Sequence, residues 1–115
     1  MIWYEKLYIG ESIPKKDAKI RRLKWKIEHN AGLCNIYIIV LCRCGTNLLE
    51  IIPTRELLQK HYPKQQLYIV GIARGYKEAL ETAAEIVTDV YKHTGGFQVK
   101  RYLLGQRKKA GDNVC

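Results

Sequence analysis

The residues that could carry out catalysis are few and lie far apart in the sequence. Ser12 is the only serine and follows Glu11, and the three histidines are His29, His61 and His93. Nucleophilic catalysis requires a nucleophile, a general base and an orienting carboxylate that converge in one pocket. No spacing in this chain indicates such a set. We therefore assign no catalytic residues and expect that the protein is not an enzyme.

Four cysteines, at positions 34, 42, 44 and 115, could bind a metal ion. Cys42 and Cys44 would point to the same side of a strand, but a structural zinc site requires about four converging ligands. The chain has no second closely spaced pair of cysteines or histidines. We therefore predict reduced thiols that pack as small apolar groups, with no metal site and no cofactor.

Positive charge is concentrated in one segment. The formal net charge is +9, and residues 15–26 contain seven basic residues and one acidic residue. Residues 107–109 add three positive charges, and the remaining charges cancel. If residues 15–29 form a helix, its basic face could follow phosphates while a tryptophan stacks on a base. The binding residues predicted on this face are Lys15, Lys19, Arg22, Trp25 and Lys26.

The same basic face allows other interpretations. A membrane surface or an acidic protein could bind the same charges, and a solvated basic helix face is common in proteins that bind no nucleic acid. No recognised nucleic-acid motif accompanies the charge. Trp25 could also belong to the core, and we favour this position slightly because a tryptophan at the edge of an apolar face is more often packed than displayed.

A second candidate site is the loop at residues 71–75. It lies between a predicted strand and a predicted helix, where free backbone N–H groups and the helix dipole favour an anion, with Arg74 and Gly75 as candidate ligands. Gly71 and Gly75, four residues apart, match neither a dinucleotide fingerprint nor a phosphate loop. Glycines that let the chain turn and approach the sheet are the simpler interpretation.

This loop belongs to the most regular part of the chain, residues 67–104. Residues 67–73 form a β-branched and aromatic run typical of a central strand with both faces covered. A helix is predicted over residues 76–93, before the stop signal at residues 94–96, and a further strand over residues 97–104. Such a unit normally closes as a right-handed crossover with parallel strands. The residues expected on the buried side of the helix are Tyr76, Ala79, Leu80, Ala83, Val87, Val90 and Tyr91.

The N-terminal segments are less regular. Residues 3–9 suit a short strand or an extended arm, because their alternation is imperfect. Residues 15–29 suit either a helix or a strand. We favour the helix, because Pro14 is well placed for its first turn and residues 30–32 supply a stop signal.

The middle of the chain predicts a hairpin and a short helix. Residues 35–43 and 48–52 are expected to pair as antiparallel strands around a turn. Thr54 can then cap a short helix that ends before Pro63.

Length and composition fit one domain. With 115 residues, 47% of them hydrophobic, the chain can bury one core but not two. We predict a single α/β domain over residues 1–104, a sandwich of about three helices on a small mixed sheet with a β-hairpin and a C-terminal right-handed βαβ unit. Residues 105–115 have no periodicity and are predicted to be a disordered basic tail.

The sequence also predicts a cellular location. No signal-peptide pattern is present at its start, where Glu5 and Lys6 interrupt the first apolar residues. The longest apolar run, residues 36–42, is far too short to span a bilayer. We expect a cytoplasmic protein that does not contact a membrane.

Four segments of the chain resemble a family. They are KLYIGES at residues 6–12, NLLEII at residues 47–52, VGIARGY at residues 70–76 followed by Glu78-Ala-Leu80, and Thr94-Gly95 with Tyr102-Leu103. In these motifs the chain is similar to short bacterial proteins of unknown function that are often found among mobile-element genes. The resemblance covers most of the chain up to Leu104. It implies a bacterial, cytoplasmic, mobile-element-associated protein and assigns no residue a mechanism.

These observations lead to one main hypothesis of function and one alternative. The main hypothesis is a small non-enzymatic accessory or regulatory protein that binds nucleic acid or an acidic protein through its basic helix. The alternative is a small-molecule or anion-binding domain, or a minor enzyme, that uses the loop at residues 71–75.

Overall fold

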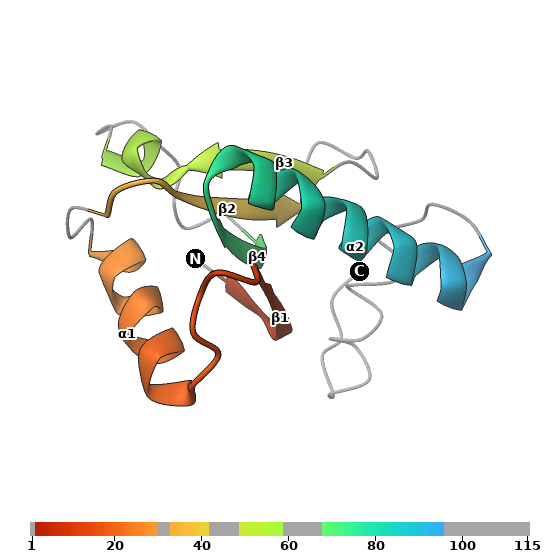
Figure 1. Cartoon of the computed structure of the whole chain (residues 1–115), viewed down its shortest axis with the longest axis horizontal. Coiled ribbons are helices and arrows are strands. Elements are labelled where there is room, and N and C mark those ends of the chain that lie inside the picture. Colours follow the sequence, from red (N-terminus) through yellow and green to blue (C-terminus); the bar gives the residue numbers. More distant parts are fainter. Residues whose placement is uncertain (1, 30–32, 42–48, 59–67, 96–115) are drawn as a thin grey trace.

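A mixed four-stranded sheet lies at the centre of the structure, a computed structural model that describes residues 2–29, 33–41, 49–58 and 68–95 (Figure 1). The strands are β1 (Ile2–Ile9), β2 (Ile36–Leu41), β3 (Leu49–Pro53) and β4 (Tyr68–Arg74). Their order in the sheet is β1-β4-β2-β3. β4 is parallel to β1 and antiparallel to β2, and β2 and β3 are antiparallel. The predictions of a mixed sheet, a paired β2 and β3, and a central β4 are confirmed.

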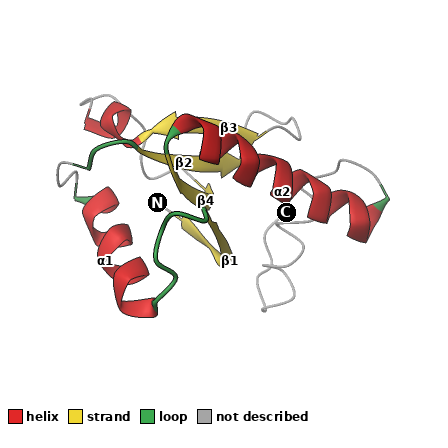
Figure 2. Ribbon diagram, viewed as in Figure 1, coloured by secondary structure: helices red, strands yellow, loops and turns green. Residues whose placement is uncertain are grey.

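The helices cover both faces of the sheet. α1 (Asp17–Glu28) lies over one face together with the 3-10 helix η1 (Thr54–Leu58), and α2 (Tyr76–Thr94) lies over the other (Figure 2). Side chains of β4 divide between the two layers: Val70 faces α2, while Ile69 faces α1. Every residue of β4 from Tyr68 to Ala73 is buried, which explains why this strand has an almost continuous apolar sequence.

β1 is a full strand rather than an extended arm. Its even-numbered Tyr4 and Tyr8 face the α2 layer, whereas Trp3, Leu7 and Ile9 face the α1 layer. The charged pair at positions 5 and 6 is exposed, and the register with β4 shifts between Trp3 and Tyr8. This irregularity is the physical counterpart of the imperfect alternation in the sequence.

α2 begins at the predicted residue and ends one residue later than predicted, but a different side of it is buried. Gly95 ends it in a left-handed conformation (φ 72°) and donates its N–H to the Tyr91 carbonyl at 2.8 Å. The buried residues of the helix are Ala79, Thr82, Ile86 and Val90. Tyr76, Leu80 and Tyr91 were expected to share this buried side, but they are 56%, 47% and 51% exposed. The sheet contacts only a narrow stripe of the helix, so the wider apolar arc is left at the surface.

α1 confirms the helical interpretation of the basic segment. It begins at Asp17, later than expected, so that Pro14 precedes the helix and does not lie in its first turn. The reason is local: Ile13 is buried and its N–H binds the Gly10 carbonyl at 3.1 Å, which keeps the chain in a turn. Ile27 is the fully buried residue of the helix, with Ile20 and Leu23 half-buried beside it.

Two finer predictions of the fold are not confirmed. The third helix is five residues of 3-10 helix, and the Thr54 hydroxyl does not cap it but donates to the Ile36 carbonyl of β2 at 3.0 Å. The βαβ unit requires a strand at residues 97–104, which lies outside the described residues, as do the tail at residues 105–115 and the hairpin turn. Within the described residues, the strand parallel to β4 is β1.

Candidate nucleic-acid interface

The outer face of α1 carries most of the predicted binding residues. Lys19 and Arg22 are exposed and lie three residues apart, and Lys26 follows Arg22 by four residues and is half-buried. Residues at these spacings occupy one side of a helix. Lys15 lies in the loop before α1, where it lines a groove instead. The structure therefore places three of the four predicted basic residues on one helical stripe and the fourth, Lys15, in the loop that lines the groove.

Trp25 is displayed on this face and is not part of the core. Its side chain is 55% exposed, so the core position that we favoured is wrong. Ile20, Leu23 and Ile27 form the side of α1 that packs on the sheet. Trp25 lies two residues from both Leu23 and Ile27, and residues two apart point to nearly opposite sides of a helix, so its side chain projects away from the sheet. An exposed indole beside Arg22 is the arrangement that base stacking requires.

His29 holds the Trp25 ring in place. The two rings are stacked with centroids 4.2 Å apart and an angle of 17° between their planes. The His29 Nδ1–H donates to the Trp25 carbonyl at 2.8 Å, which fixes the imidazole against the indole. Sequence reasoning missed this pairing, although the spacing of four residues on a helix was a signal for it.

The opposite edge of α1 is tied to β1. The Trp3 Nε1–H donates to Glu28 Oε2 at 2.9 Å, and Lys24 Nζ lies 5.6 Å from the centroid of the Trp3 ring. Lys24 is therefore used in a cation–π contact within the protein. The two tryptophans of the chain have different roles, since Trp3 joins α1 to the sheet and Trp25 faces solvent.

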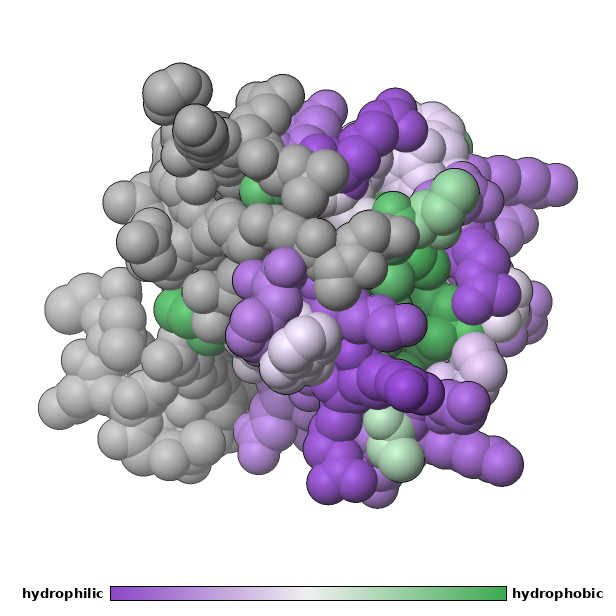
Figure 3. All heavy atoms as spheres, turned by 90° about the vertical axis from the view of Figure 1, so that its left-hand side faces the viewer, coloured by the Kyte–Doolittle hydropathy of each residue, from purple (hydrophilic) through white to green (hydrophobic). Residues whose placement is uncertain are grey.

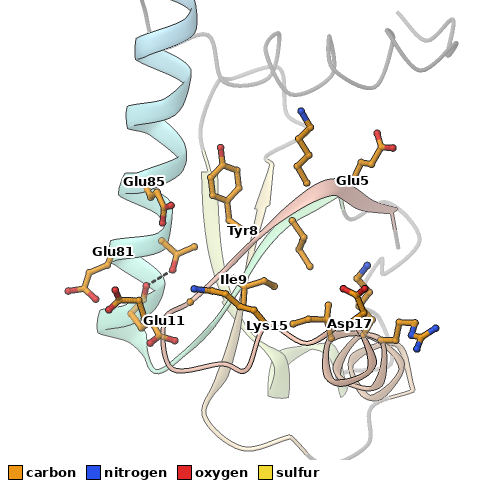
Figure 4. Close-up of a pocket in the computed structure, with 16 residues that line it drawn as sticks. Glu5, Tyr8, Ile9, Glu11, Lys15, Asp17, Glu81 and Glu85 are labelled. Atoms are coloured by element: carbon orange, nitrogen blue, oxygen red, sulfur yellow. Dashed lines mark hydrogen bonds between the residues drawn. The ribbon is translucent and has the colours of Figure 1, made fainter.

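Seen from the side on which α1 lies, the described surface is mainly hydrophilic, with a smaller hydrophobic area among the hydrophilic residues (Figure 3). A groove of about 1140 Å³ runs beside β1 between α1 and α2 (Figure 4). Glu81 and Glu85 of α2 form one wall, while Lys15, Arg21 and Lys24 contribute positive charge to the other. Because the two walls carry opposite charges, the groove does not extend the basic surface of α1 as a continuous positive patch.

The second candidate site, at the start of α2, is closed by a carboxylate of the protein. Glu78 accepts the Arg74 N–H at 2.7 Å, the Ser12 N–H at 3.0 Å and the Ser12 hydroxyl at 2.9 Å. Gly75 has a positive φ of 85° and donates its N–H to the Asn35 carbonyl at 2.8 Å. The backbone donors of Arg74 and Gly75 thus already have partners inside the protein, where an external anion would need them free.

The ionisation of Glu78 reflects this environment. Burial raises the pKa of the carboxyl group, but the hydrogen bonds from Arg74 and Ser12 and the charge of Arg74 outweigh burial and hold the pKa below its usual 4.5. Sequence reasoning gave Glu78 no such role. Its position three residues after the N-cap Gly75 was the signal that could have identified it, because a glutamate at this position commonly reaches back to backbone N–H groups.

Catalytic and metal-binding groups do not converge in the described part of the chain. The Ser12 hydroxyl contacts Glu78, and no group of three or more histidine, cysteine, aspartate or glutamate residues there could hold a metal ion. Cys42 and Cys44 lie outside the described residues. None of the helices described is both long and apolar enough to cross a membrane.

Comparison with known proteins gives no information about the exposed face of α1. No family model, curated protein or solved structure matches the chain significantly.

Proposed function

We propose that the protein binds single-stranded nucleic acid through the outer face of α1. The observation that carries this proposal is the exposure of Trp25, at 55%, beside Arg22 on a helix of positive charge. Exposure of so much apolar indole surface to water is unfavourable in free energy, and stacking on a base would bury that surface. In the cell we propose an accessory or regulatory role in the bacterial cytoplasm, in association with a mobile element, which the resemblance of the four segments supports.

Lys19, Arg22 and Lys26 would bind the phosphate backbone. Charges on one helical stripe can follow a strand without reading its sequence, because phosphates are identical at every nucleotide. Trp25 would contribute through stacking, which every base can provide. The expected binding is therefore salt-dependent and tolerant of sequence. An acidic protein is the competing partner for the same charges, and no contact among the described residues favours an external anion at the start of α2.

Tryptophan fluorescence provides a direct test. In a Trp3→Phe background, Trp25 is the one remaining tryptophan, so any change on titration with a single-stranded oligonucleotide reports on the proposed site. We expect the emission to change and the binding constant to fall steeply with salt. Trp25→Ala should weaken binding by roughly 1 to 3 kcal/mol with little change in the salt slope. Lys19→Gln with Arg22→Gln should reduce the slope by about one for each phosphate that is no longer bound.

Lys77→Gln is the matched control. Lys77 is exposed on α2, away from α1, and its replacement removes the same charge as each replacement on α1. Equal weakening by Lys77→Gln and Arg22→Gln would show that only net charge matters. Absence of binding to single and double strands at low salt would exclude the nucleic-acid function and favour an acidic protein partner.

A further inference from the structure

His29 extends the basic stripe of α1 by one position. Lys19, Arg22 and Lys26 follow one another at steps of three and four residues. His29 comes three residues after Lys26, and residues at these spacings share one side of a helix. It is the C-cap of α1 and is exposed, so its ring lies at the end of the same stripe. A positive charge at this position would also interact favourably with the negative end of the helix dipole.

One nitrogen of the His29 ring is already used within the protein. The Trp25 carbonyl accepts the backbone N–H of His29 at 3.0 Å and lies 2.8 Å from Nδ1. A carbonyl oxygen can only accept, so Nδ1 carries a hydrogen in the neutral ring as well as in the charged ring. The proton that makes the ring cationic is therefore added at Nε2. Protonation thus leaves the hydrogen bond to Trp25 in place and changes the charge of the ring without moving it.

The His29 ring is also stacked on the indole of Trp25. The ring centroids lie 4.2 Å apart and the planes are 17° from parallel. A cation held against the face of an indole is attracted by the π electrons, so the stack is compatible with the charged ring as well as the neutral ring. Because His29 covers one face of the indole, a base would stack on the other face.

The charged side chains next to His29 on α1 are Lys26 and Glu28. Glu28 accepts the Trp3 Nε1–H at 2.9 Å, so the side chain of β1 that contacts this end of α1 in the described structure is a neutral indole. Lysine and glutamate ordinarily keep their charges between about pH 5 and about pH 8, whereas histidine changes its charge in this range. A change of charge at this end of the stripe within that range is therefore a property of His29.

From this geometry we infer that His29 is a further nucleic-acid-binding residue, which donates Nε2–H to a phosphate when its ring is charged. The inference rests on the proposed function, because it adds a fourth cation to Lys19, Arg22 and Lys26. The ligand of His29 is a phosphate of the bound single strand, while Trp25 beside it stacks on a base. Binding is then stronger and depends more steeply on salt at lower pH, because each phosphate contact releases counterions.

Tryptophan fluorescence of the free protein tests the contact between the two rings without nucleic acid. In the Trp3→Phe background, a charged imidazole stacked on Trp25 quenches the emission by accepting an electron from the excited indole. We expect the emission to fall in a single step as the pH is lowered from about 8 to about 5.5, and we expect no such step in His29→Gln.

His93→Gln is the matched control for the fluorescence titration. His93 lies in the last turn of α2, is exposed and has its Nδ1 2.7 Å from the Asp89 carbonyl, the same contact that His29 makes on α1. Its replacement should leave the step in emission unchanged. An emission that does not change with pH, or a step that persists in His29→Gln, would overturn the inference.

The salt dependence of binding tests the phosphate contact. The ligand is an oligothymidylate, because thymine does not titrate in this range of pH. We expect the slope of the logarithm of the binding constant against the logarithm of the salt concentration to be steeper by about 0.7 at about pH 5.5 than at about pH 8. His29→Gln should keep the shallower slope at both pH values, and His29→Lys, with a permanent charge, should keep the steeper slope at both. Circular dichroism of each variant at both pH values would verify that the fold is retained.

The results separate the role of His29 from the proposed function. Binding with the same salt slope at both pH values, or a slope that still becomes steeper in His29→Gln, would overturn the role of His29 and leave binding through α1 in place. Absence of binding at both pH values would overturn the proposed function and the phosphate contact of His29 with it.

Discussion

Ser12 and Glu78 are joined by two hydrogen bonds across 66 residues of sequence. The Glu78 carboxylate accepts the Ser12 N–H at 3.0 Å and its hydroxyl at 2.9 Å, and also accepts the Arg74 N–H at 2.7 Å. This contact connects the loop before α1 with the junction of β4 and α2. The position of α1 against the sheet therefore depends in part on one side chain of α2.

Replacement of Glu78 by glutamine should destabilise the protein. Glu78→Gln keeps the size of the side chain but removes the negative charge that strengthens the three hydrogen bonds. We expect a loss of about 1 to 2 kcal/mol in the free energy of unfolding, measured by urea denaturation. Glu81→Gln is the control, because Glu81 is exposed on the same helix and should change stability by less than about 0.5 kcal/mol. Equal effects of the two replacements would contradict the structural role of Glu78.

The contribution of Glu78 should disappear in acid. The unfolded chain protonates this carboxyl near pH 4.5, whereas the folded protein protonates it only at lower pH. The stabilisation is therefore complete above pH 4.5 and is lost as the pH falls through the lowered folded-state pKa. We expect the stability difference between wild type and Glu78→Gln to shrink over this range, measured by thermal unfolding from about pH 6 to about pH 3. A difference that stays constant with pH would show that ionisation of Glu78 does not stabilise the fold.

Gly10 should tolerate no side chain while Glu78 is in place. A Cβ atom at this buried position would lie 2.6 Å from Glu78 Cδ and would displace the carboxylate from Ser12. Gly10→Ala should therefore be destabilising, but much less so in a Glu78→Ala background. A double-mutant cycle by chemical denaturation should give a coupling energy of about 0.5 to 3 kcal/mol. If the effects of Gly10→Ala and Glu78→Ala are additive, the loss of stability in Gly10→Ala does not arise from contact with Glu78.

Trp25→Ala and Ile27→Ala should differ in their effect on stability, because Trp25 is exposed on α1 and Ile27 is buried. Trp25 is 55% exposed, so its replacement should change the free energy of unfolding by less than about 1 kcal/mol. Ile27 is 1% exposed, and its replacement should cost about 2 to 5 kcal/mol. Thermal denaturation of the two variants under the same conditions provides the comparison. A large loss of stability for Trp25→Ala would show that the indole packs in the core after all.

Features that depend on neighbouring residues could be predicted from the sequence alone. The apolar run of β4 indicated a strand with both faces covered, and Gly95 indicated the end of α2, because periodicity and stop signals act within a few residues. The pairing of β2 with β3 followed from the short separation of two strand-like segments. The concentration of charge in α1 was also visible without any structure.

The tertiary structure decided which apolar surfaces are covered and which side chains meet. Periodicity shows which residues share a side of a helix, but it does not show how much of that side another element covers. Trp25 and Leu80 are therefore exposed although both lie next to apolar positions, and β1 is the parallel neighbour of β4 although 58 residues separate Ile9 from Tyr68. The contact between Ser12 and Glu78 likewise required segments far apart in the sequence to come together, and such contacts leave no local pattern.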